Sequence, residues 1–220
     1  MDLNKLIGKI ELKIIDMFKN DNTGHDIYHL KRVLNNAQKI QAKEGGDKLI
    51  ISVAAILHDV HGLMGKEQKK FVHPRDSLDK IKEILSDIDL DEKTLNHILH
   101  CIEYHEEYAF SEEGITVTDI ESLILQDADN LDAIGAIEIA RNNMFCGNHN
   151  IPMYLPEIPL ESETYDVSIH DPSMIHHFYT KLLKLKDNMN TETGKKLAQG
   201  KHEFMETYLK QFFAEWNGEK

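Results

Sequence analysis

The chain has 220 residues, enough for one large domain or two small ones, and 41% of them are hydrophobic, as expected for a folded protein with a buried core. Its formal net charge of -13 disfavours nucleic-acid polymers and anionic membranes as partners, because either would require a basic surface. A small anionic substrate fits this charge only where a metal ion or a group of lysines supplies a local positive centre.

The chain shows no sign of a membrane span or a disulfide framework. Its longest strongly apolar run, 49–57, is far shorter than the roughly 18–20 residues that a span requires. The first 15 residues alternate charged and apolar side chains instead of forming a signal-peptide core. Cys101 and Cys146 lack CxxC spacing and are expected to be reduced thiols. We therefore expect a cytoplasmic protein.

Helical periodicity begins at the N-terminus. Residues 2–19 place their apolar side chains on one face at 3.6 spacing, which predicts an amphipathic helix that ends in the turn-rich NDNTGHD. A second helix is predicted over 26–44, where Gly45 and Gly46 follow. Residues 48–59 are apolar on nearly all sides, which indicates a buried central helix.

The rest of the chain is also helical, with one long interruption. Further helices are predicted over 75–86, 91–106, 120–143, 173–190 and 192–216, several opened by residues such as Asp119 and Ser173 that cap helices well. The segment 145–172 holds four of the five prolines, has no helical period, and is expected to be a loop that covers a site. The prediction is a single all-α domain over 1–220, with a core at about 24–143 and C-terminal helices at 173–216.

The stretch AILHDVHG at 55–62 ends an apolar helix in His58 and Asp59, two groups that are costly to bury. The dipeptide by itself is weak evidence, because His-Asp also occurs at His25-Asp26 and at His170-Asp171. The surrounding sequence must decide whether the pair has a function.

A second acidic ending to an apolar run is LILQDADNLDAIG, which contains Asp127. A calcium loop from Asp127 to Glu138 is excluded, because position five is Leu131 and position six, where a sharp turn needs glycine, is Asp132. Asp129, Asn130 and Asp132 are expected to cap or solvate a helix. Asp127 follows the apolar pattern directly, so its carboxylate needs a cation or hydrogen bonds.

His25 and His29 stand four residues apart and share one helix face. Taken singly, each histidine is typical of an ordinary surface or core residue. Four groups on three predicted helices, however, each interrupt or end an apolar face: His29, His58, Asp59 and Asp127. In one core they would be mutually costly unless a metal ion held them together.

Three stretches together resemble the HD-domain phosphohydrolase superfamily, whose metal ligands occur in the order H, HD, D: GHDIYHLKRV at 24–33, AILHDVHG at 55–62 and LQDADNLDAIGAIEIAR at 125–141. In addition, HFYTKLLKLKDNMNTETGKK at 177–196 is similar to a bacterial subgroup that includes a nucleotide pyrophosphohydrolase. The resemblance extends from about residue 24 to residue 213.

The resemblance implies that the metal ligands are His29, His58, Asp59 and Asp127. It implies a divalent cation, Mn²⁺ in the first place, with Mg²⁺, Fe²⁺, Zn²⁺ or Ni²⁺ as alternatives. The residues similar to those that bind a second metal or phosphate in other branches are His73, His100 and His105.

The chemistry that follows is attack of a metal-activated water on phosphorus, with Asp59 or Asp127 orienting the water and His61 assisting. The residues expected to contact substrate are His25, Arg32, Lys66, Arg141, Lys181 and Lys184. Each lysine is equally well interpreted as a solvated surface charge.

The function predicted first is hydrolysis of nucleoside or deoxynucleoside triphosphates to monophosphate and pyrophosphate. A nucleotidase or phosphodiesterase on the same scaffold is the alternative enzyme, and a noncatalytic HD-like signalling module is the alternative from another class. The expected ligand is a small anionic phosphate ester, with neither nucleic-acid polymer nor membrane as partner, and a homodimer is left open.

Overall fold

The structure, a computed structural model, describes residues 2–19, 21, 23–68, 72–106, 116–160, 165–166 and 169–220; of residues 66–68 it describes the backbone alone. Its elements in chain order are α1 (Leu3–Ile14), α2 (Ile27–Glu44), α3 (Lys48–Leu57), α4 (Val60–Gln68), η1 (Pro74–Ser77), α5 (Leu78–Leu85), α6 (Glu92–Glu103), α8 (Ile120–Asp132), α9 (Ala136–Asn148), α10 (Met174–His177), η2 (Phe178–Leu182), η3 (Leu185–Asn188) and α11 (Glu192–Trp216). The described residues contain no strand, so the predicted all-α class is confirmed.

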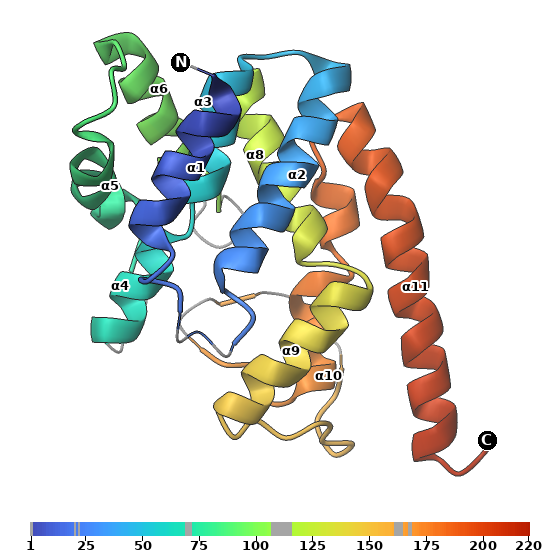
Figure 1. Cartoon of the computed structure of the whole chain (residues 1–220). Helices are drawn as coiled ribbons and strands as arrows, with labels where there is room; N and C mark the ends of the chain where they lie inside the picture. The colour runs from blue at the N-terminus through green and yellow to red at the C-terminus, as the bar shows by residue number, and fades with distance from the viewer. Residues whose placement is uncertain are drawn as a thin grey trace.

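The helices pack around α3, which is buried on all sides. Every side chain from Ile50 to Leu57 is buried, and α3 packs against α1, α2, α6 and α8. Figure 1 shows α2 and α8 side by side in the middle of the molecule, with α11 along one flank. This arrangement brings the end of α3, the start of α2 and the second half of α8 to one place.

Residues 48–65 are long and apolar enough to cross a membrane, by length and composition alone. However, 67% of this stretch is buried inside the protein, and the central helix of a soluble protein has the same properties. Its burial among four other helices supports the interpretation as core.

Side-chain caps fix where several helices begin. The Asp26 carboxylate accepts hydrogen bonds from the backbone N–H groups of Tyr28 and His29, so α2 begins at Ile27 and His29 lies in its first turn. Asp47 starts α3 in the same way, and Asp119 starts α8. Local sequence thus determines the position of His29 along its helix.

The predicted helices 48–59 and 120–143 are both divided in the structure. The first ends at Leu57, and the chain turns at His58 and Asp59 before α4 begins. The second breaks after Asp132, where Gly135 has a φ of +85°, a backbone conformation that glycine adopts without strain. Helical period alone did not reveal either break, because the apolar pattern continues across both.

The remaining predicted helix bounds also change in part. The helix expected at 2–19 ends at Ile14, and the segment 173–190 forms the short α10, a π turn and a 3₁₀ turn instead of one helix. In contrast, α9 continues to Asn148, so the first four residues of the loop expected at 145–172 are helical. The expected helix 75–86 is divided between η1 and α5.

Candidate metal centre and adjoining cavity

Two histidines and one aspartate from separate elements meet inside the bundle. The Nε2 atoms of His29, on α2, and His58, just after α3, lie 3.2 Å apart. Asp129 Oδ1, on α8, lies 3.5 Å from His29 Nε2 and 3.6 Å from His58 Nε2. These three ligand atoms all lie within 4.8 Å of one another, so one ion can contact all of them.

Hydrogen bonds to the far side of each ring decide which nitrogen faces this centre. His29 Nδ1 lies 2.7 Å from Asp132 Oδ2, and His58 Nδ1 lies 2.8 Å from the carbonyl oxygen of Ala55. Since both oxygens can only accept, each Nδ1 carries a proton that it donates. Each Nε2 is therefore the nitrogen that faces the centre and that a metal ion would bind.

The resulting arrangement fits a divalent cation. His29 and His58 are 2% and 1% exposed, and their Nε2 atoms face each other at 3.2 Å with Asp129 beside them. Burial by itself raises the pKa of Asp129, but His58 and His29 outweigh it and hold this pKa well below its usual value. Two imidazole nitrogens and a carboxylate oxygen suit a borderline or hard divalent metal.

A second group of ligand type adjoins the first and consists of His61, His105 and Glu106. The rings of His58 and His105 have centroids 5.0 Å apart, so the two groups are neighbours. His105 Nδ1 lies 2.7 Å from the carbonyl oxygen of Ile102, and its Nε2 is buried and has no hydrogen-bond partner among the described residues. A buried nitrogen lone pair of this kind fits a second cation or a protonated ligand.

His61 and Glu106 form an ion pair. His61 Nε2 lies 3.5 Å from Glu106 Oε2. Burial lowers the pKa of His61, but the hydrogen bond and negative charge of Glu106 outweigh it and raise this pKa to about 9. Burial likewise raises the pKa of Glu106, and His61 outweighs it and lowers this pKa to about 2.

The structure does not bring Asp127, the fourth expected ligand, into either group. Its two carboxylate oxygens accept hydrogen bonds from the backbone N–H groups of Asn190 and Thr191, at 2.7 and 2.8 Å, and from the Thr191 hydroxyl at 2.6 Å. The α11 backbone approaches so closely that a Cβ on Gly194 would lie 2.2 Å from Asp127 Oδ2. Asp127 therefore holds the start of α11, and Asp129 takes its place beside the histidines.

Asp59 lies next to the metal group but outside it. Its Oδ1 lies 3.9 Å from His61 Nδ1, and the side chain lines a cavity. Gly62 allows this position, because a Cβ there would lie 2.7 Å from Asp59 Oδ1. The carboxylate is thus placed where it can contact a molecule in the cavity, next to His61.

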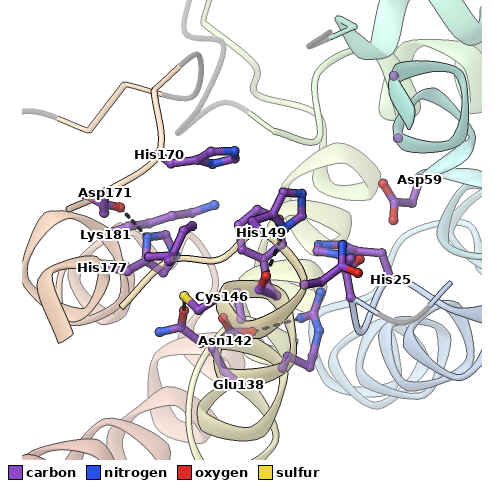
Figure 2. Close-up of a pocket in the computed structure, with 18 of the residues that line it drawn as sticks. His25, Asp59, Glu138, Asn142, Cys146, His149, His170, Asp171, His177 and Lys181 are labelled. Carbon is purple, nitrogen blue, oxygen red and sulfur yellow. Dashed lines mark hydrogen bonds and ion pairs between the residues drawn. The ribbon is translucent and has the colours of Figure 1, made fainter. Parts of the chain in front are cut away.

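The cavity has a volume of about 940 Å³, large enough for a nucleotide-sized molecule. It adjoins the two groups of metal-ligand type, because its lining includes His25, Asp59, His61 and Glu106. In Figure 2, His25 and Asp59 stand on one side, and Lys181, His177 and His170 stand on the other. Residues of α9, including Asn142 and Cys146, form the floor between them.

Two of the predicted cationic residues line the cavity. Lys181 lies 4.9 Å from the centroid of the Tyr165 ring; burial lowers its pKa, but Tyr165 and Glu106 outweigh burial and raise it, so the lysine is charged. Arg141 Nη1 lies 3.1 Å from Glu138 Oε2 and 3.3 Å from Asp132 Oδ2. Both cations thus face the cavity that adjoins the metal group.

Arg32 and Lys184 are not among the residues that line this cavity. Arg32 donates two hydrogen bonds to the Asp132 carboxylate, with Nε 2.7 Å from Oδ1 and Nη2 2.9 Å from Oδ2. Asp132 in turn holds His29, so Arg32 acts on the metal group by positioning and does not touch the cavity. The side chain of Lys66 lies outside the described residues.

Of the residues expected to hold a second metal or phosphate, only His105 belongs to a group beside the metal centre, the one that it forms with His61 and Glu106. His73 Nδ1 accepts a hydrogen bond from the backbone N–H of Arg75 at the start of η1. His100 Nε2 lies 3.1 Å from Asp119 Oδ2, at the opposite end of α8 from Asp129. His25, which was expected to contact substrate, lines the cavity, with its ring 5.7 Å from that of His29.

Sequence reasoning missed Asp129, Asp132 and Glu106. One signal was present: Asp129 and Asp132 are three residues apart and share a helix face, whereas Asp127 and Asp129 are two apart and point about 200° apart around the helix axis. If all three carboxylates are buried, Asp127 must therefore have partners different from those of Asp129 and Asp132. For Glu106, the sequence alone offered no comparable signal.

Comparison with known proteins gives the family. A family model of the HD domain matches residues 26–134. An HD-superfamily hydrolase from Bacillus thuringiensis is 34% identical in sequence, with a TM-score of 0.73 and coverage of 98% of both chains. A protein structure from Lactobacillus plantarum has a TM-score of 0.79 at 29% identity and covers 96% of this chain and 97% of its own.

Bacillus subtilis YpgQ is a further relative, 30% identical over 94% of this chain and 92% of YpgQ. Its crystal structure in complex with ADP has a TM-score of 0.68 and 28% identity, and the alignment covers 96% of this chain and 95% of that one.

The match to the HD domain and the identity with an HD-superfamily hydrolase along nearly the whole chain show that this chain belongs to the HD superfamily. It is a metal-dependent phosphohydrolase. The resemblance expected from the three sequence motifs is thereby confirmed.

Proposed function

We propose that this phosphohydrolase cleaves nucleoside or deoxynucleoside triphosphates to the monophosphate and pyrophosphate. The observation that carries the proposal is a nucleotide-sized cavity with histidines and carboxylates beside the metal group on one side and the charged Lys181 on the other. The complex of the relative YpgQ with ADP supports a nucleotide as the ligand class.

The residues that would hold the catalytic ion are His29, His58 and Asp129, with Asp59 completing the set from the adjacent position. Their nitrogen and oxygen donors favour Mn²⁺, and Mg²⁺, Fe²⁺, Zn²⁺ or Ni²⁺ are alternatives. When bound, a divalent cation neutralises phosphate charge and lowers the pKa of a coordinated water. Asp132 and Arg32 keep the His29 ring oriented for this role.

Asp59 is the residue that we assign to the attacking water. Its carboxylate lines the cavity beside His58, it is largely buried, and its oxygens can accept a proton or a hydrogen bond from a water at the phosphate. Asp127 has no part in this step, because its oxygens are occupied at the start of α11.

The phosphate chain would lie between two sources of positive charge. Lys181 contacts it from one wall, and the His61 imidazolium, which Glu106 stabilises, contacts it from the other. Arg141, at the floor, adds further positive charge. In an enzyme with two ions, His61, His105 and Glu106 would hold the second one instead.

The nucleoside would lie against aromatic side chains that also line the cavity. The rings of Phe145 and His149 stack with centroids 4.1 Å apart, and His170 lies 5.1 Å from His149. Flat rings of this kind accept the face of any nucleobase, which fits a triphosphatase that acts on several bases. A cytoplasmic location accords with such substrates and with the two free cysteines.

The test is a product analysis with Mn²⁺ and a panel of nucleoside mono-, di- and triphosphates. We expect pyrophosphate and monophosphate from triphosphates, and loss of this activity in His58→Ala and in Asp59→Asn. Release of orthophosphate from monophosphates, without pyrophosphate from any triphosphate, would replace the proposal with a nucleotidase.

A further inference from the structure

A third group of metal-ligand type lies away from the catalytic cavity, where α6 meets the start of α8. Its members are His97 and Cys101 on α6 and Asp119, the N-cap of α8, and their ligand atoms all lie within 4.8 Å of one another. Since Asp119 precedes Asp129 by ten residues of helix, the two sites are about 15 Å apart along the α8 axis.

The contacts bring three side chains of α6 to one carboxylate. His97 Nε2 lies 3.0 Å from Asp119 Oδ1, and His100 Nε2 lies 3.1 Å from Asp119 Oδ2. Cys101 Sγ lies 4.0 Å from Asp119 Oδ1. On α6, residues 97, 100 and 101 follow the spacing that places side chains on one helix face.

We propose that His97, His100, Cys101 and Asp119 form a second kind of metal site, which binds a thiolate-preferring divalent cation such as Zn²⁺. The donors match the nitrogen, sulfur and oxygen atoms that Zn²⁺ takes in tetrahedral protein sites. The catalytic group contains no sulfur, so the two sites differ in the metal that they prefer. This site is independent of the substrate proposed above.

The charge and burial of the surroundings suit a cation. Glu121 Oε2 lies 3.6 Å from His97 Nε2 and adds a second negative charge next to Asp119. Cys101 is fully buried, whereas the His97 and Asp119 side chains are 29% and 26% exposed, so an ion can enter from the solvent side. On binding, the Cys101 thiol gives its proton to water and the sulfur becomes the ligand.

A cation at this place would join two parts of the fold. Asp119 already caps α8 by accepting a hydrogen bond from the Ser122 backbone N–H at 3.0 Å. Figure 1 shows α6 and the first turns of α8 at the end of the molecule opposite α9 and α10. The ion would therefore tie α6 to the beginning of the helix whose other half carries Asp129, and its effect is on stability and not on the chemical step.

The decisive test uses sulfur ligation, because neither His29, His58 and Asp129 nor His61, His105 and Glu106 includes a cysteine. Metal-free, reduced protein is titrated with Co²⁺, and the near-ultraviolet thiolate-to-cobalt absorption band is recorded. We expect the band in the wild-type chain, in His58→Ala and in the matched control Cys146→Ser, and its loss in Cys101→Ser. Absence of the band from the wild-type chain at saturating Co²⁺, or its persistence in Cys101→Ser, would overturn the proposal.

A second measurement follows the stabilising effect of Zn²⁺ in the His58→Ala background, where the catalytic group is weakened. We expect Tm to rise by roughly 5–10 °C at a zinc concentration about 100-fold above the dissociation constant. Adding His97→Ala or Cys101→Ser should remove this rise, while Cys101→Ser alone should keep Mn²⁺-dependent activity within about twofold of wild type. An equal rise in Tm with and without Cys101 would contradict the site.

A third measurement needs no variant and remains decisive if a substitution prevents folding. Zinc K-edge X-ray absorption of the wild-type chain loaded with one equivalent of Zn²⁺ should show a sulfur neighbour at about 2.3 Å. A first coordination shell made of nitrogen and oxygen alone, at both one and two equivalents, would exclude Cys101 as a ligand.

Discussion

The two faces of α8 carry carboxylates that are only two residues apart and have different partners. On one face, Asp129 lies against His29 and His58, and Asp132 fixes the His29 ring. On the other face, Asp127 accepts hydrogen bonds from residues at the start of α11. One face forms the metal centre, and the other fastens the C-terminal helix to the core.

This difference shows that burial of a carboxylate implies a partner without identifying it. Both Asp127 and Asp129 interrupt an apolar run, and each would be costly if left without a cation or hydrogen bonds. Backbone N–H donors satisfy the first, and imidazole nitrogens with a cation satisfy the second. The two kinds of partner predict opposite mutational behaviour, which the following substitutions test.

The largest effect is expected for Asp129→Asn. Removing the charge that faces His29 and His58 should weaken metal binding and lower kcat/KM by about 10³-fold, equivalent to roughly 4 kcal/mol of transition-state stabilisation. The metal-free chain should also lose some stability, because His58 and His29 favour the ionised carboxylate, but the loss of bound metal should be the larger effect. Initial rates, bound metal by mass spectrometry and urea unfolding measure the three quantities.

Asp127→Asn should show the reverse pattern. The amide nitrogen would face the donors of Asn190 and Thr191, so we expect a loss of about 1–3 kcal/mol in the free energy of unfolding. Bound metal per folded chain should match wild type. Normal stability combined with lost metal would return Asp127 to the ligand set and refute the division between the two faces.

Asp132→Asn tests whether the metal face depends on support behind the ligands. Asp132 accepts from His29 Nδ1 and from Arg32, so its loss frees the ring and disturbs the tautomer. We expect metal affinity to fall by roughly 10- to 100-fold, with a smaller change in kcat at saturating metal. Competition with a chelating dye measures the affinity, and an unchanged value would remove Asp132 from the positioning role.

Gly62→Ala probes the placement of Asp59. The added methyl group would lie 2.7 Å from Asp59 Oδ1, so the carboxylate must move, and kcat should fall by roughly tenfold. Gly147→Ala is the matched control, because it is also a helical glycine and a Cβ there meets nothing within 4 Å. Equal kcat values for the two variants would contradict the proposal that catalysis depends on the position of the Asp59 carboxylate.

The smallest effect is expected from a surface carboxylate that has no part in either face. Hydrogen bonds from Lys13 and Lys9 lower the pKa of Asp87 to about 2. A lowered pKa in the folded state contributes stability above about pH 4, and this contribution disappears as the pH falls toward 2. Tm of wild type should therefore exceed that of Asp87→Asn slightly at pH 7 and converge with it near pH 2; a constant difference would contradict the linkage.

The elements that sequence predicted well are those determined by local chemistry. Asp26, Asp47 and Asp119 start helices because a side-chain oxygen reaches nearby N–H groups, and the residue pattern reveals this directly. The apolar run of α3 predicted a buried central helix, because side chains that are apolar on all sides of a helix favour burial. The breaks after Leu57 and Asp132 were missed, because the apolar period continues through both turns.

The candidate site divides in the same way. His29 and His58 were identified because each interrupts an apolar helix face, and the structure brings their Nε2 atoms within 3.2 Å. Asp127 was chosen over Asp129 because it follows the apolar run more closely. Only the packing of α11 against α8 shows that Asp127 already has partners.

By itself, the sequence determined the all-α class, because helix periodicity and capping are properties of a single segment. The HD chemistry came from the resemblance of three motifs to that superfamily, and those motifs contain His29 and His58. The tertiary structure decided which carboxylate faces the metal, which cations line the cavity, and that His97, His100, Cys101 and Asp119 meet far from it. These outcomes depend on which helix faces pack together, a choice made by long-range burial that no local pattern contains.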